Sequence, residues 1–380
     1  MDLESLADRM SSRASKYDVS GDFPEEDFDD LRAAGLLGLM VPRRLGGGGA
    51  SFAEYTDVAM RLGSGAGATA LIFNMHASVT GALAHIPEEL VRQFGAPESF
   101  AASRDRVLQA AAGGALYAVA MSERGIGSRL SKVRTSYERT DSGFRITGAK
   151  TFVSGAGHAD AYLVAARDST SEGPRISYFL VPSGSGVEVR PAWDALGMRA
   201  TASHDLHLHA EVGEDALLGG IEGTALLLAQ VMPQWLVASY AAVYVGVAKA
   251  VLRHGAEHLN ERGLQRLPMV RARMGRADTQ VAAAELVVRN AARLVTEDPG
   301  SPETNRWVWR AKLAAGDTAA EVAFSVLEAA GASAMRRGHP LERLYRDARC
   351  GALQPATSDV CADWLGACAM GDDPDEVARW

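Results

Sequence analysis

The chain has 380 residues, 47% hydrophobic and 23% charged, which is typical of a globular protein long enough for two or three domains. Its net charge of -8 and pI near 5.7 argue against a nucleic acid or an anionic membrane as the main partner, because either would repel an acidic protein. The acidic N-terminus lacks a basic region followed by an apolar one, so we expect no secretory signal and a cytoplasmic location.

Residues 1–113 are predicted to form an N-terminal helical domain. Leu31 and Ala34 belong to short apolar clusters at helical spacing, and Pro24 is placed as in the first turn of a helix. Pro42, followed by the glycines at 46–49, predicts a loop.

Residues 114–220 change to a period of two, which predicts a central β-barrel-like domain, either a barrel or a pair of packed sheets. Val133, Thr135 and Tyr137 alternate with polar neighbours and predict a strand. Asp141-Ser142-Gly143 then predicts a turn into the next strand, which begins at Phe144.

Residues 221–380 are predicted to form a C-terminal four-helix bundle. One helix places Val281, Ala284, Val288, Ala291 and Val295 on a single face. Ser301-Pro302 predicts an N-cap and first turn of another helix, which ends near Gly331. The fold class is therefore α+β multidomain, in the order helical domain, β-domain, helical bundle.

The most apolar segment, Thr224 to Leu252, requires a check for a membrane span. Gln230, Pro233, Gln234 and Lys249 interrupt it before any run reaches the length that a bilayer demands. We expect a helix buried within the bundle and no membrane association.

The segment Ala118–Ser128 ends in Ser-Glu followed by a Gly-x-Gly-Ser turn. Such a turn can present main-chain N–H groups and a hydroxyl to a planar or phosphorylated ligand. It is not a dinucleotide fingerprint, since Leu130 replaces the third glycine and β-structure follows. Taken alone, it fits an ordinary tight turn better than a binding site.

Three segments in the β-domain, in this order, resemble the acyl-CoA dehydrogenase superfamily of flavoenzymes: Ala118–Ser128, Gly148–Asp160 and Leu196–Arg199. The resemblance extends outward to Gly35–Pro42 and to Pro340–Arg349, in which Arg346-Asp347 is interpreted as a structural pair. It spans nearly the whole chain. It implies a flavin oxidoreductase that binds FAD, with FMN or reduced flavin supplied by a reductase as the alternative.

The resemblance also implies roles for individual residues. Two segments would follow the pyrimidine edge and the pyrophosphate of the flavin and place an aromatic ring and a hydroxyl near flavin N5, where donors and dipoles tune the reduced ring. An arginine after the long helix would reach the flavin of a neighbouring subunit. The residues implied to bind the cofactor are Met121, Ser122, Gly127, Ser128, Phe152, Val153, Ser154 and Arg262.

The chain departs from the family at the catalytic glutamate, which abstracts the α-proton of an acyl thioester. The corresponding position is Pro355, which has neither a carboxylate nor an N–H group. The alternative position used by some members corresponds to about Leu236, and no acid occurs between Gln230 and Val251. Glu123, Gln354 and Asp359 lie near the predicted site in sequence, and the catalytic base stays unassigned.

The cofactor motifs also differ from the family pattern. The segment after Arg262 is short and lacks a phenylalanine, and Glu328 replaces a glutamine. A glutamate near a pyrophosphate is unfavourable unless a cation pairs with it. Arg129 replaces an aspartate and offers a compensating charge.

Three functions remain open. Dehydrogenation of an acyl thioester, on CoA or a carrier protein, by hydride transfer to flavin N5 is ranked first because it is the commonest activity of the family. A reduced-flavin-dependent monooxygenase is the alternative, and a scaffold that has lost flavin and binds an acyl group or a partner protein is the third.

The resemblance further implies a homodimer or homotetramer and an electron acceptor or flavin reductase as partner. We predict no metal site. Asp205, His207 and His209 share one face of a strand, but Leu206 and Leu208 point to the core, so the polar face is interpreted as solvated.

Overall fold

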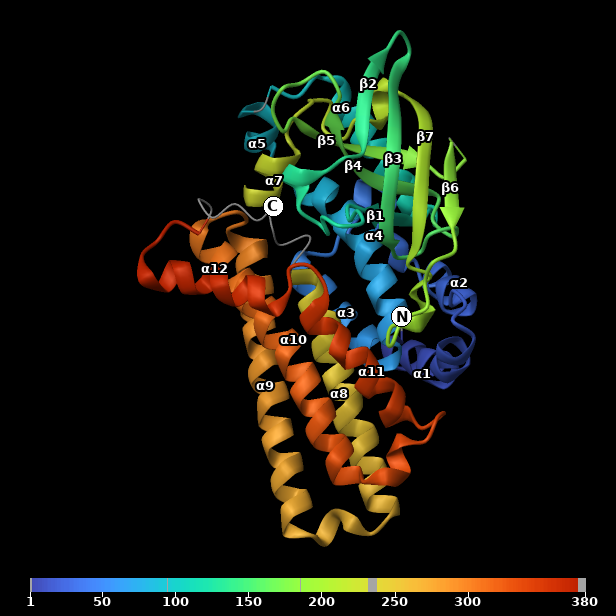
Figure 1. Ribbon diagram of the computed structural model, residues 1–380, viewed down its shortest axis with the longest axis vertical. Coiled ribbons are helices and arrows are strands. Elements are labelled where there is room, and N and C mark those ends of the chain that lie inside the picture. Colours follow the sequence, from blue (N-terminus) through green and yellow to red (C-terminus); the bar gives the residue numbers. More distant parts are fainter. Residues whose placement is uncertain (1, 94, 185, 232–237, 375–380) are drawn as a thin grey trace.

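The computed structural model describes residues 2–93, 95–184, 186–231 and 238–374 (Figure 1). An N-terminal group of helices, a curled sheet and a C-terminal helical bundle follow one another along the chain, as the sequence predicted. In Figure 1 the sheet lies at one end of the molecule and the long bundle helices extend away from it. Among the described residues, no helix has both the length and the apolar character needed to cross a membrane.

The N-terminal helices enclose α4, whose side chains are buried over most of its length. This helix contacts α3, α8 and β1, so it joins all three parts of the fold. The helices are α1 (Leu3–Ser20), α2 (Glu25–Ala33), α3 (Phe52–Gly65), α4 (Gly67–His85), α5 (Glu88–Gln93) and α6 (Ser99–Ala112).

In the described residues the central sheet has seven strands in the order β1-β4-β2-β3-β7-β6, with β5 also paired to β4. The strands are β1 (Tyr117–Ala120), β2 (Ser136–Thr140), β3 (Gly143–Val153), β4 (Ala161–Asp168), β5 (Ile176–Pro182), β6 (Val187–Arg190) and β7 (His204–Gly213). The predicted turn at Asp141-Ser142 is confirmed, because Thr140 pairs with Gly143 across the β2–β3 hairpin.

The strand predicted from Val133 is only partly correct. Residues Leu130–Lys132 form a 3-10 turn, and β2 begins at Ser136. The reason is a competing acceptor: the main-chain N–H groups of Arg134 and Thr135 donate to the carboxylate of Glu123, at 2.8 and 3.0 Å. A side chain thus takes the bonds that a neighbouring strand would otherwise make.

The C-terminal bundle consists of α8 (Ala238–Glu261), α9 (Pro268–Glu297), α10 (Pro302–Ala330) and α11 (Pro340–Leu353). A short helix, α7 (Ala225–Val231), precedes it, and α12 (Ser358–Met370) follows it. The predicted start of α10 is confirmed, since the Ser301 side chain accepts the N–H of Thr304. The predicted apolar face of α9 is buried. Part of the predicted helix over 224–252, at 232–237, lies outside the described residues.

Helix α11 ties the bundle to the other two domains. A methyl group at Gly197 would lie 2.3 Å from the main-chain oxygen of Arg346, so only glycine permits this approach. Asp347 Oδ1 accepts the N–H of Met198 at 2.6 Å, and the Arg346 guanidinium pairs with Asp18 of α1. Arg346 also donates to the main-chain oxygen of Leu196 at 2.9 Å, so it contacts both other domains, while Asp347 holds the same loop at Met198.

Candidate active site

The loop from Met121 to Ser128 is closed by its own main chain. Glu123 and Gly127 exchange two main-chain hydrogen bonds of 3.0 Å each, and Gly125 and Gly127 have positive φ angles of 83° and 64°. Nothing lies within 4 Å of a side chain built at either glycine. Met121 is buried, Ser122 and Ser128 are half-buried and Gly127 is exposed. The loop therefore offers an open main-chain surface of the kind that fits a flat ligand edge.

Beneath this loop lies a buried ion pair between Glu123 and Lys150, at 2.9 Å. Burial raises the pKa of Glu123, but the Lys150 ammonium and the bonds from Thr135 outweigh it, so the net shift is downward. Burial lowers the pKa of Lys150 to about 8, against the opposing effect of Glu123. Glu123 is an ionised carboxylate whose two oxygens both accept hydrogen bonds, one from Lys150 and Thr135 and the other from Arg134. This arrangement excludes it as the missing base.

The predicted aromatic position is exposed, as a ligand-contacting ring must be. Phe152 is 64% exposed, has a positive φ of 58° and meets Trp193 edge-on, with ring centroids 6.1 Å apart. Val153 is fully buried, main chain included, and its carbonyl accepts the N–H of Ala156 at 3.1 Å. The main-chain N–H of Thr151 donates to Ser122 at 2.9 Å, which brings this strand end against the glycine loop.

Ser154 belongs to a chain of buried hydroxyl groups. Its Oγ lies 2.9 Å from Ser203 Oγ, which lies 2.7 Å from Thr201 Oγ1. Thr201 Oγ1 donates to the main-chain oxygen of Met198 at 2.9 Å. The three segments that carried the family resemblance are therefore connected, the first two by the Thr151–Ser122 bond and the second and third through Ser203 and Thr201. An exposed ring, a hydroxyl and an open glycine loop together fit an isoalloxazine ring.

Pro355 lies between the end of α11 at Leu353 and the start of α12 at Ser358. Figure 1 shows the turn that joins these two helices at the end of the bundle nearer the sheet. Lys312 of α10 is buried beneath this turn and donates to the main-chain oxygens of Gly351 and Gln354, at 2.8 and 3.2 Å. Burial lowers the pKa of Lys312 to about 8. The lysine thereby satisfies carbonyl groups at the C-terminus of α11 that have no helical partner.

The turn between α11 and α12 has no carboxylate at position 355, where the family's dehydrogenases carry the catalytic glutamate. The Gln354 side chain is a neutral amide, and Asp359 is exposed on the first turn of α12. The other predicted position, Leu236, lies outside the described residues, and no acid occurs in its sequence neighbourhood. Neither family position for the base, Pro355 or Leu236, holds an acidic residue in this chain.

Arg262 does not join the other predicted cofactor residues within one chain. It is exposed at the far end of the bundle, where its guanidinium donates to Ser333 Oγ at 3.0 Å. Glu328, which would be unfavourable near a pyrophosphate without a cation, is paired with Arg273 at 2.5 Å. A cofactor role for Arg262 depends on a neighbouring subunit and stays a prediction.

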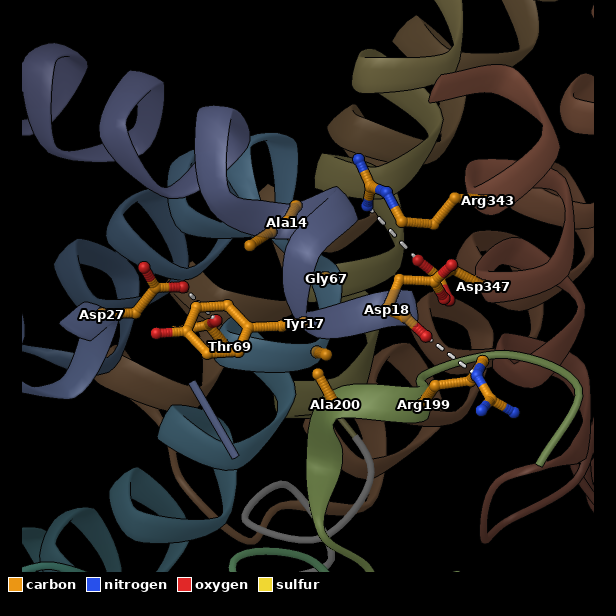
Figure 2. A pocket seen from close by; sticks show the side chains of 12 residues that line it. Ala14, Tyr17, Asp18, Asp27, Gly67, Thr69, Arg199, Ala200, Arg343 and Asp347 are labelled. Atoms are coloured by element: carbon orange, nitrogen blue, oxygen red, sulfur yellow. Dashed lines mark hydrogen bonds and ion pairs between the residues drawn. The ribbon is translucent and has the colours of Figure 1, made fainter. Parts of the chain in front are cut away.

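A small cavity lies away from these residues, at the junction of α1, α2, α4 and α11 (Figure 2). Its volume is about 20 Å³, enough for roughly one water molecule and far too small for a flavin. Asp27, on its wall, accepts from Thr69 Oγ1 at 2.6 Å, and burial raises its pKa to about 6. Figure 2 also shows Asp18, Arg199, Arg343 and Asp347 around it. The cavity belongs to the contact between domains.

Within the described ranges, no group of three or more histidine, cysteine or acidic side chains could hold a metal ion. Asp205 instead accepts from Thr151 at 2.6 Å and pairs with Arg124 at 2.6 Å. Leu206 and Leu208 are buried, as their alternation predicted.

Several residues of the site carry no signal in the sequence. Lys150, Ser203 and Lys312 matter because of partners 27 to 49 residues distant along the chain, and the main-chain oxygen of Thr201 accepts the N–H of Gly155 from another segment. A lysine within an apolar helical pattern, as at Lys312, is the one local hint of a buried amine.

Comparison with known proteins identifies the family. Acyl-CoA dehydrogenase models match the chain as N-terminal domain at residues 4–98, middle domain at 118–210 and C-terminal domain at 238–358. L-evernosamine nitrososynthase of a Micromonospora species is 30% identical over 98% of this chain and 90% of its own. The putative acyl-CoA dehydrogenase YdbM of Bacillus subtilis is 28% identical over 95% of this chain and 94% of its own.

Among solved structures, FMN-bound TdsC from Paenibacillus sp. A11-2, a dibenzothiophene monooxygenase, has a TM-score of 0.84. Its sequence is 26% identical to this one, and the match covers 97% of this chain and 96% of the TdsC chain. The family models, the relatives and the shared fold agree along nearly the whole length of the chain. The chain belongs to the acyl-CoA dehydrogenase superfamily of flavin-dependent oxidoreductases.

Proposed function

We propose that this protein is a reduced-flavin-dependent monooxygenase. The observation that carries the proposal is Pro355, which stands where the family's dehydrogenases need a carboxylate to remove an α-proton. The carboxylate of the glycine loop, Glu123, is ionised and bound to Lys150 and two main-chain N–H groups. Thioester dehydrogenation, ranked first from the family resemblance, has no base at these positions.

Monooxygenation needs no such base. Reduced flavin supplies two electrons and two protons, one atom of dioxygen enters the substrate, and the other leaves as water. The residues of this chain then have to hold the flavin, exclude water and orient the substrate. The 26% identity to a dibenzothiophene monooxygenase over almost the whole chain supports this assignment.

We propose FMN, delivered in reduced form by a separate reductase, as the cofactor. Glu328, at the family's position for a glutamine near the pyrophosphate of FAD, pairs with Arg273, and the segment after Arg262 is short and lacks the family's phenylalanine. The TdsC structure, which contains FMN, supports the same choice.

We also propose a homodimer or homotetramer. Two large apolar side chains, Leu286 of α9 and Phe324 of α10, are 69% and 54% exposed on the outside of the bundle, and a second copy would cover them.

The test of the proposed reaction is the transfer of labelled oxygen. The protein is supplied with FMN, a flavin reductase, NADH and labelled dioxygen, together with a panel of aromatic and amino-sugar compounds. We expect one labelled atom in a product, dependent on both the protein and the reductase. A product that is two hydrogens poorer than its substrate and unlabelled would overturn the proposal.

A further inference from the structure

The hydroxyl chain Thr201–Ser203–Ser154 has a fixed direction. Thr201 Oγ1 lies 2.9 Å from the Met198 carbonyl oxygen, which has no hydrogen to give. Two oxygens at this distance attract only if a hydrogen lies between them, so the single hydroxyl hydrogen of Thr201 is used on Met198.

This assignment determines the next two bonds. With its hydrogen used, Thr201 can only accept from Ser203, across 2.7 Å. Ser203 has then used its own hydrogen and can only accept from Ser154, across 2.9 Å. The hydrogen of Ser154 therefore points to Ser203. What Ser154 offers to a ligand is a lone pair on Oγ.

The backbone around this chain is strained in a way that a purely structural turn would avoid. Phe152, Met198 and Ala202 have φ angles of 58°, 54° and 44°, and they are the non-glycine residues with positive φ in the parts of the chain that the structure describes. All three lie within three residues of a member of the hydroxyl chain. Such strain collects at ligand sites, where the surrounding structure holds it in place.

The strained loop is also fixed from outside. Asp347 of α11 accepts the N–H of Met198 at 2.6 Å, and Trp193 Nε1 donates to the Met198 oxygen at 3.2 Å. The Thr201 oxygen accepts the N–H of Gly155 at 2.8 Å, next to Ser154. Each hydroxyl therefore has a set position, and the direction of the chain follows from that of Thr201.

We propose that Thr201 and Ser203 are positioning residues that hold Ser154 Oγ as a hydrogen-bond acceptor, and that the site thereby selects the reduced flavin. This inference rests on the proposed placement of flavin N5 near Ser154. Oxidised flavin presents a lone pair at N5, which the Ser154 lone pair repels. Reduced flavin presents N5–H, which Ser154 accepts.

The measurable consequence is a difference in affinity between the two redox states. One hydrogen bond of ordinary strength makes the reduced form bind about tenfold more tightly than the oxidised form. For a two-electron couple, a tenfold ratio raises the midpoint potential of the bound flavin by about 30 mV over that of free FMN.

The test uses FMN-loaded protein without oxygen or substrate, and measures both dissociation constants and the midpoint potential. Thr201→Val removes the hydroxyl that directs the chain, so Ser154 becomes free to donate, and we expect the tenfold preference and the shift of about 30 mV to be lost. Thr56→Val is the matched control. Thr56 is equally buried and donates to the Phe52 carbonyl at 2.9 Å on α3, outside the site.

Ser203→Ala is a second, smaller change that breaks the same chain and guards against misfolding of the first variant. It should also abolish the preference, while Thr56→Val keeps it. A midpoint potential unchanged in both chain variants, or a wild-type protein that binds oxidised FMN as tightly as reduced FMN, would overturn the proposal. The dissociation constants and the midpoint potential are measured without oxygen or substrate. A failure of this inference is therefore distinguished from a failure of the proposed monooxygenase reaction, which the labelled-oxygen experiment tests.

Discussion

At the scale of single residues, the site is defined by which carboxylates are already engaged. Glu123 lies within the predicted flavin loop, Met121 to Ser128, and sequence alone leaves it available as a base. Its partner Lys150 is 27 residues away, and only the fold brings the two within 2.9 Å. A charge buried with its counter-ion and two N–H donors serves stability.

Replacing Glu123 with Gln should therefore destabilise the fold. Lys150 would lose its counter-charge and would have to stay buried as an unpaired ammonium or release its proton, so we expect a loss of about 3 kcal/mol in the free energy of unfolding, measured with urea. Because the folded pKa of Glu123 is lowered, its contribution is present above the unfolded value of about 4.3 and is lost as the pH falls below it.

Glu138→Gln provides the control, since Glu138 forms a half-exposed pair with Arg145 on the β2–β3 hairpin. Its cost should stay below about 1 kcal/mol. An equal loss of unfolding free energy in Glu123→Gln and Glu138→Gln would show that the buried Glu123–Lys150 pair contributes no more to stability than an exposed pair does.

At the scale of elements, the sequence predicted those features that depend on interactions between residues close together in the chain. Ser301-Pro302 marked the start of α10 because an N-cap and a first-turn proline act within one helical turn. The alternation at Val133–Tyr137 predicted too long a strand, because the competing acceptor, Glu123, lies 11 residues before Arg134. The close approach of Gly197 to α11 depends on a residue 149 positions away and had no local signal.

Gly197→Ala tests this contact. The added methyl group would lie 2.3 Å from the Arg346 oxygen, so α11 or the loop must move. We expect a loss of about 2 kcal/mol in unfolding free energy and weaker FMN binding, because the same loop carries Thr201 and Ser203.

Gly275→Ala is the control for this substitution. Gly275 lies inside α9 with nothing within 4 Å of an added Cβ, and alanine there should stabilise the helix by up to about 1 kcal/mol. Stability and FMN affinity that are unchanged in Gly197→Ala would show that the loop does not depend on its contact with α11.

At the scale of the whole molecule, the order of helical domain, sheet and bundle was predictable because hydrophobic period and turn residues change along the chain. The reaction was not predictable in the same way, because the family's fold is kept while its base is replaced by Pro355. The predicted domain boundaries, at 113 and 220, stay predictions. Helix α11, which holds Asp18 through Arg346 and Met198 through Asp347, makes the three parts depend on one another.

The lack of a base for thioester oxidation is tested most directly by anaerobic mixing of the FMN-loaded protein with acyl-CoA thioesters, from butyryl-CoA to palmitoyl-CoA. The visible absorbance of the flavin reports the reaction. We predict that the flavin stays oxidised with every thioester, since no carboxylate occupies position 355. Bleaching of the flavin that saturates with thioester concentration and yields the enoyl product would contradict this.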